Sequence, residues 1–225
     1  MKRFLPLLIL VFSIFYIFFI PSEPLGIKIL FKLIPMWFIL YFAFSQKPFL
    51  SSKYRTLILI GLFFCMIGDG TLIWFVIGLS AFLIGHLFYT AGFISNWKYS
   101  HKRMLSIIPI AIYAFLMCSN ITKALIDKGD SGLIIPVIAY TIAISTMVFT
   151  AIMTGNKWAI FGSVLFIISD SILSWDLFVQ SIQYSHELIM ITYYSAQFLI
   201  ARSILSLNQS HNILHSITER TKIKG

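Results

Sequence analysis

Residues 71–96 read TLIWFVIGLSAFLIGHLFYTAGFISN and contain no Asp, Glu, Lys or Arg. A helix needs about 20 mostly apolar residues to cross the hydrocarbon core of a bilayer, and this stretch is long enough. Similar apolar stretches recur on both sides of it along the chain. The stretch therefore decides the fold class, which we predict to be an all-α, polytopic membrane helix bundle.

Eight such stretches are separated by short polar connections, for example Pro21-Ser22-Glu23-Pro24 and Lys128-Gly129-Asp130. The first follows Lys2-Arg3 and lacks a small-x-small cleavage site, so we expect a retained helix rather than a signal peptide. The third is short for a membrane span. The sequence predicts one transmembrane domain over residues 1–207 and a polar cytoplasmic tail over 208–225, with spans at 4–20, 27–45, 55–69, 71–96, 104–121, 132–153, 157–177 and 187–207.

The composition agrees with a membrane protein. Of the 225 residues, 59% are hydrophobic and 11% are charged, against roughly 45–50% and about 25% in soluble globular domains. So few charged side chains cannot cover a core of that size in water, which excludes a soluble single domain. Cys65 and Cys118 lie inside apolar runs without a CxxC motif, which indicates neither a disulfide framework nor a zinc cluster.

The net charge of +9 indicates topology. In alternate connections, 13 of the 17 Lys and Arg residues fall on one side of the predicted membrane and 4 on the other. Because positive residues are enriched on the cytoplasmic side, both termini are predicted to be cytoplasmic. We attribute the basic excess to anionic lipid contact and expect no nucleic-acid partner. The expected location is the inner membrane of a bacterial cell. The minority side holds Lys28, Lys32, Lys123 and Lys128.

Two acids lie inside predicted spans, where an ionisable residue costs at least roughly 2.5–3.5 kcal/mol. Asp69 ends the third span and Asp170 lies in the seventh. Both spans run outward, so both acids are expected in the outer half of the membrane. Polar side chains of the second, sixth and eighth spans share that half, and those of the fourth span lie along one helical face. We predict that the bundle brings them together in one polar pocket that opens towards the non-cytoplasmic leaflet. Its expected supporting members are Lys32, His86, Tyr89, Tyr140, Tyr193, Tyr194 and Gln197.

Each member also has a purely structural interpretation. An intramembrane Asp can be a hydrogen-bonding strut between helices, and His86 can be a satisfied core histidine. Lys32 can extend to the membrane surface, Tyr140 can pack at the interface, and Tyr193 with Tyr194 can belong to an aromatic belt. Two further features are expected to have no part in the site: residues 12–19 as lipid-facing bulk, and His186 and Glu187 as a solvated helix start.

Several short motifs occur in order along the chain: Lys32-Leu33-Ile34-Pro35-Met36, Gly68-Asp69-x-x-Leu72, Phe82-x-x-Gly85-His86-x-x-Tyr89, Tyr140 through Met147, Phe166-x-x-Ser169-Asp170-x-x-Leu173 and Tyr193-Tyr194-x-x-Gln197. Their order and spacing resemble the lysoplasmalogenase (YhhN) family of eight-span membrane proteins. The resemblance covers nearly the whole chain. At one point the sequence departs from it, since two residues separate Lys32 from Pro35 where the family favours Lys directly before Pro.

The resemblance implies hydrolysis of the vinyl ether bond of a lysoplasmalogen, with Asp69 and Asp170 as the catalytic pair. That chemistry needs an acid, because a vinyl ether is cleaved after protonation of its β-carbon, and an anion, because an oxocarbenium ion forms. Two carboxyl groups divide these roles in glycoside hydrolysis, which proceeds through a similar cation. The scheme needs no metal and no other cofactor. The expected partners are a lysophospholipid substrate and membrane lipid.

Three other functions fit the same residues. The first is a proton-coupled or ion-coupled transporter of a small solute, because intramembrane acids often serve as ion sites. The second is a metal-dependent lipid hydrolase, although it would need several buried histidines and His86 alone lies inside a predicted span. The third is a ligand-binding or structural membrane protein without chemistry.

Overall fold

The computed structural model describes residues 4–21, 23–46 and 52–222, with Ser52 and residues 206–222 in their backbone only. The basic residues Lys2, Arg3, Lys47 and Lys224, and the side chains of Arg220 and Lys222, lie outside these described parts. The helices are α1 (Leu5–Phe19), α2 (Leu25–Ser45), α3 (Ser52–Thr71), α4 (Phe75–Ile94), α5 (His101–Met104), α6 (Ile107–Lys128), a 3-10 turn η1 (Ser131–Leu133), α7 (Ile134–Thr154), α8 (Lys157–Phe178) and α9 (Ser185–Lys222).

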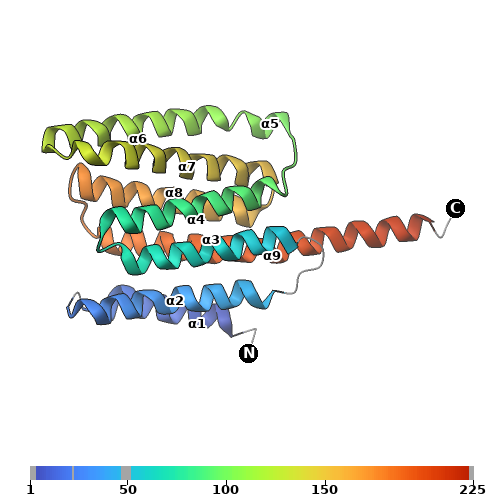
Figure 1. Cartoon of the computed structure of the whole chain (residues 1–225). Coiled ribbons are helices and arrows are strands. Elements are labelled where there is room, and N and C mark those ends of the chain that lie inside the picture. The colour runs from blue at the N-terminus through green and yellow to red at the C-terminus, as the bar shows by residue number, and fades with distance from the viewer. Residues whose placement is uncertain (1–3, 22, 47–51, 223–225) are drawn as a thin grey trace.

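The long helices run side by side along one common direction (Figure 1). The described residues form no strand, so the predicted all-α class is confirmed. Seven of the described helices are long and apolar enough to cross a membrane, which makes this a multi-pass membrane protein, whereas the apolar α1 has 15 residues. A membrane crossing by α1 therefore stays a prediction.

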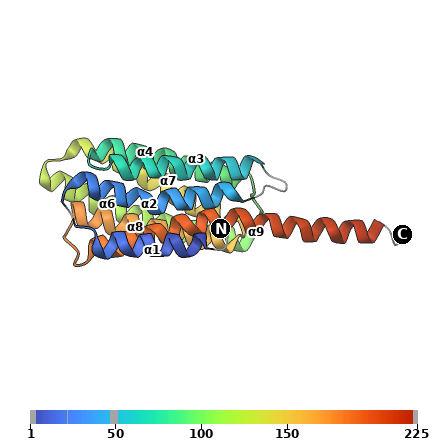
Figure 2. The ribbon, with the colours of Figure 1, turned by 90° about the horizontal axis from the view of Figure 1, so that it is seen from below.

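The two ends of the bundle differ in the chain segments that lie there. α1 begins and α9 ends at one end, as Figures 1 and 2 both show. The α1–α2, α3–α4, α6–α7 and α8–α9 connections lie at the opposite end, which we call the loop end (Figure 1). The start of α1 and the end of α9 therefore lie at the same end of the bundle, which agrees with the predicted even number of spans. Which side is cytoplasmic stays a prediction.

Several predicted boundaries were wrong. The third span is not short, because α3 has 20 residues and continues through Gly68-Asp69-Gly70 to Thr71. The fifth span does not end at 121 but continues to Lys128, because its later polar side chains, such as Lys123 and Asp127, are exposed and need no burial. The helix then ends at Gly129, whose φ of 80° suits glycine. The α9 backbone remains helical past residue 207 and extends beyond the bundle (Figure 2).

Glycines bring two pairs of helices unusually close. A Cβ atom on Gly61 of α3 would lie 2.5 Å from the ring of Tyr89 on α4. A Cβ atom on Gly162 of α8 would lie 3.0 Å from the backbone oxygen of Ala196 and 3.0 Å from the backbone nitrogen of Ile200, both on α9. Small residues allow such close backbone approach in membranes, where helices associate through packing. These two close pairs fix the positions of the acids that α3 and α8 carry.

Residues 12–19 do not face lipid throughout. Phe15, Phe18 and Phe19 are exposed, as predicted for lipid-facing bulk. Tyr16, however, is 2% exposed, and Ser13 is also buried. The prediction was therefore wrong for the face of α1 that packs against α9.

Candidate active site

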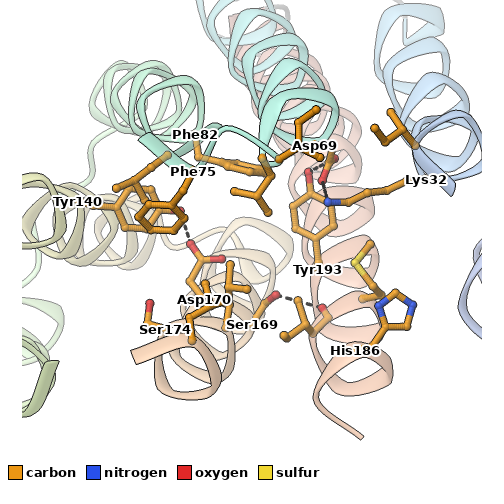
Figure 3. A pocket seen from close by; sticks show the side chains of 18 of the residues that line it. Lys32, Asp69, Phe75, Phe82, Tyr140, Ser169, Asp170, Ser174, His186 and Tyr193 are labelled. Carbon is orange, nitrogen blue, oxygen red and sulfur yellow. Dashed lines mark hydrogen bonds and ion pairs between the residues drawn. The ribbon is translucent and has the colours of Figure 1, made fainter. Parts of the chain in front are cut away.

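A cavity of about 330 Å³ lies among α1, α2, α3, α4, α7, α8 and α9 (Figure 3). Its walls include the first turns of α2, α4 and α9 and the last turn of α8, which places it towards the loop end. Leu25, Ile73 and Leu177 line it and are each roughly half exposed, at 45%, 49% and 46%. The mouth therefore opens at the loop end of the bundle, and these apolar side chains form part of its rim.

Asp69 enters the cavity from the last turn of α3. Its side chain is 2% exposed, and its Oδ1 lies 3.1 Å from the Lys32 Nζ of α2. The Tyr193 hydroxyl of α9 donates to Asp69 Oδ2 at 2.5 Å. A buried carboxylate is tolerated only where charge and hydrogen bonds compensate it, and both are present here. Lys32 does not extend to the membrane surface; it binds the acid.

Asp170 enters from α8 on the other side of the cavity (Figure 3). The Tyr140 hydroxyl of α7 donates to Asp170 Oδ2. His86 Nε2 of α4 lies 2.9 Å from the same hydroxyl and 3.6 Å from Asp170 Oδ2. Since the single Tyr140 proton goes to the carboxylate, His86 Nε2 must donate to the Tyr140 oxygen, which assigns the imidazole tautomer.

His86 supports the wall from behind. It is 0% exposed, and its ring lies edge-on to that of Phe166 with centroids 4.7 Å apart. Its Nδ1 has no hydrogen-bond partner among the described residues. His86 therefore acts on Asp170 through Tyr140 and does not itself line the cavity.

The structure brings together five of the nine predicted site residues, since Lys32, Asp69, Tyr140, Asp170 and Tyr193 all line the cavity. Tyr194 lies behind the wall and donates its hydroxyl proton to the Lys32 backbone oxygen at 2.8 Å. Tyr89 and Gln197 are fully buried and pair with each other at 2.6 Å, away from the lining. These last two side chains join α4 to α9.

Sequence reasoning missed several lining residues. Tyr16, Lys28 and Ser169 line the cavity, and so does His186, which is partly buried rather than part of a solvated helix start. The His186 ring packs edge-on against Tyr16 with centroids 5.6 Å apart. Lys28 could have been found, because it precedes Lys32 by one helical turn and shares its face. Tyr16 carries no such signal, because it lies in a uniformly apolar run.

Among the described residues, no group of three or more His, Cys, Asp or Glu side chains could hold a metal ion. The cavity instead combines two carboxyl groups with phenols, a lysine ammonium and apolar walls. Such a site can transfer a proton to an amphiphilic ligand and stabilise a cation.

The sequence pattern of the YhhN family matches residues 27–204, which include nearly every residue of this cavity. This chain belongs to the YhhN family. Tyr16 and Leu25 are the two lining residues outside the matched range.

Curated proteins similar to this YhhN chain are named lysoplasmalogenases. The Mus musculus lysoplasmalogenase TMEM86B is 31% identical over 210 residues, which cover 91% of this chain and 87% of the mouse protein. The Homo sapiens TMEM86B protein is 30% identical over 207 residues, covering 90% and 87%. The Bos taurus lysoplasmalogenase TMEM86A is 31% identical over 203 residues, covering 84% and 83%. No solved structure matches the chain significantly.

Proposed function

We propose that this protein hydrolyses the vinyl ether bond of lysoplasmalogens, releasing a fatty aldehyde and a glycerophospho-ethanolamine or glycerophosphocholine. The observation that carries the proposal is the pair of carboxyl groups, Asp69 and Asp170, on opposite walls of one cavity with apolar side chains at its mouth. Similarity to proteins named lysoplasmalogenases supports the same reaction. An amphiphile with one chain fits a cavity whose walls carry both polar and apolar side chains.

The reaction begins with proton transfer to the vinyl ether carbon that lies β to the oxygen. The double bond supplies the electron pair, and an oxocarbenium ion forms at the α-carbon. Water adds there and gives a hemiacetal, which loses the glycerol oxygen as an alcohol and becomes the aldehyde. One water molecule is consumed, and the acid regains its proton when water is deprotonated.

The two carboxyl groups are not equivalent, and we assign their roles from their partners. Asp69 has an ammonium and a phenol at hydrogen-bond distance, so we assign it as the anion that stabilises the oxocarbenium ion and orients water. Asp170 has the Tyr140 hydroxyl on Oδ2 and, among the described residues, no hydrogen bond to Oδ1. We therefore assign Asp170 as the acid, with Oδ1 carrying the proton that it transfers.

Three residues position this pair. Lys32 fixes Asp69 and balances its charge, while Tyr193 fixes the other oxygen of that carboxyl group. Tyr140 orients Asp170 and is itself held by His86. Each carboxyl group accepts a hydrogen bond from one tyrosine hydroxyl, which restricts its rotation. This restriction favours a preorganised site.

Release of fatty aldehyde from a lysoplasmalogen by the purified protein tests the proposal. We expect turnover by the parent chain, and a loss of about 10²–10⁴-fold in kcat for Asp170→Asn and Asp69→Asn. Asp127→Asn is the matched control, because Asp127 is exposed on α6 and lies outside the cavity.

The same experiment addresses the transporter alternative. Parent protein that is folded, yet releases no aldehyde from ethanolamine or choline lysoplasmalogens, would contradict the hydrolase. Counterflow of a solute in liposomes that depends on Asp69 and Asp170 would then assign the acids to ion coupling.

A further inference from the structure

Basic side chains and phenylalanine rings line different sides of the cavity. Lys28 and Lys32 of α2 and His186 of α9 line one side. Phe75 of α4 and Phe178 of α8 line the other, with their rings edge-on and the centroids 5.5 Å apart. In Figure 3, Phe75 lies on the side of Tyr140 and Asp170, whereas His186 and Lys32 lie opposite.

Of the two lysines, one is already paired. The Lys32 Nζ binds Asp69 at 3.1 Å, so a second anion would have to compete with that carboxylate. Lys28 lies one turn closer to the start of α2 and to the mouth, is partly exposed, and has no ion pair among the described residues. Its ammonium is therefore available to an anionic ligand at the mouth.

His186 lies beside this position and adds a second donor. It lines the cavity from the first turn of α9, and Tyr16 packs against its ring at 5.6 Å. The imidazole is thus held at the cavity wall. A flexible ammonium and a fixed ring nitrogen together suit a phosphate group, which offers several acceptor oxygens.

We propose that Lys28 and His186 bind the phosphodiester of a lysophospholipid head group, while the hydrocarbon chain lies against the side of Phe75 and Phe178. This inference rests on the proposed function and adds the substrate's orientation to it. The glycerol unit then spans the cavity, and the first carbons of the chain lie between Asp69 and Asp170. The head group stays at the mouth, where it keeps its contact with water.

Equilibrium binding of a lysophospholipid with a saturated 1-alkyl ether chain tests this proposal, because that ligand has no vinyl ether to cleave. The comparison ligand is the 1-alkylglycerol with the same chain and no phosphate. In uncharged detergent we expect Lys28→Met to weaken phospholipid binding about tenfold. We expect His186→Gln to weaken it several-fold, and both variants to bind the alkylglycerol within about twofold of the parent.

Lys123→Met is the matched control, because it removes the same charge from an exposed position on α6, on the side of the membrane where Lys28 is predicted to lie. We expect its binding to equal that of the parent. Lys28→Arg keeps the cation and should retain most of the affinity, which separates charge loss from damage to the fold.

Two outcomes would overturn the inference. The first is phospholipid binding by folded Lys28→Met and His186→Gln at parental affinity. The second is displacement of the lipid by chain-free glycerophosphoethanolamine at a similar concentration, which would assign the site to a soluble phosphodiester. Failure of the hydrolase proposal is distinguishable, since it would leave this binding pattern intact while no aldehyde is formed.

Discussion

Lys32 is expected to affect both the activity of the site and the stability of the bundle. Its ammonium compensates Asp69, a carboxylate whose side chain is 2% exposed, from a position that is itself 15% exposed. Breaking one partner of such a buried pair leaves an uncompensated charge, which is more destabilising than removing both partners. The Tyr194 hydrogen bond to the Lys32 backbone further holds α2 against α9.

We therefore expect Lys32→Met to destabilise the protein by about 3 kcal/mol and to reduce aldehyde release. The double variant Lys32→Met/Asp69→Asn should regain much of the stability but remain inactive. Thermal unfolding in detergent measures the first effect. A double variant no more stable than Lys32→Met would show that the ion pair does not account for the loss.

At the scale of elements, the site depends on how closely the helices that carry its residues approach each other. Asp170 and Tyr193 lie on α8 and α9, which meet at Gly162. The nearest α9 atoms include backbone atoms, which cannot rotate away as a side chain can. A methyl group at Gly162 would therefore separate the two helices and alter both walls of the cavity.

Gly162→Ala should cost about 1–3 kcal/mol of stability and lower kcat, because both acids would lose their alignment. The matched control is Gly26→Ala near the start of α2, where an added Cβ atom has nothing within 4 Å. Thermal unfolding and turnover of the two variants can be measured together. Parental stability of Gly162→Ala would show that the α8–α9 contact is loose.

At the level of the whole molecule, the distribution of basic residues predicts the orientation in the membrane. The loop end holds the cavity, and the minority of the basic residues was predicted on that side of the membrane. If the positive-inside rule holds here, the cavity opens to the non-cytoplasmic leaflet, and its substrate arrives from there.

Labelling of introduced cysteines tests this orientation, because the native Cys65 is buried and only Cys118 needs to be replaced. In a Cys118→Ser background, an impermeant maleimide should label Gly132→Cys in intact cells, because η1 lies at the loop end. Tyr99→Cys, an exposed position before α5, should be labelled only after the membrane is permeabilised. The reverse pattern would place the cavity on the cytoplasmic side.

The lengths of the apolar stretches and the positions of charged residues within them predicted the fold class and the main residues of the cavity. The all-α class and the positions of Asp69, Asp170 and Lys32 at one cavity follow from residues whose burial in lipid would otherwise be costly. Helix ends were less predictable. The helix α3 continues through Asp69, which is paired with other helices, and α6 continues through Lys123 and Asp127, which are exposed. Tyr16 and His186 could not be found, since their roles depend on how α1 packs against α9.

The central claim is that an acid of this site protonates the β-carbon of a vinyl ether. Hydrolysis of a lysoplasmalogen in D₂O, with the aldehyde trapped as it forms, measures that step directly. We expect one deuterium at the carbon next to the aldehyde carbonyl with the parent protein, and no product above background with Asp170→Asn. Aldehyde without deuterium at that carbon, or undiminished product from Asp170→Asn, would contradict it.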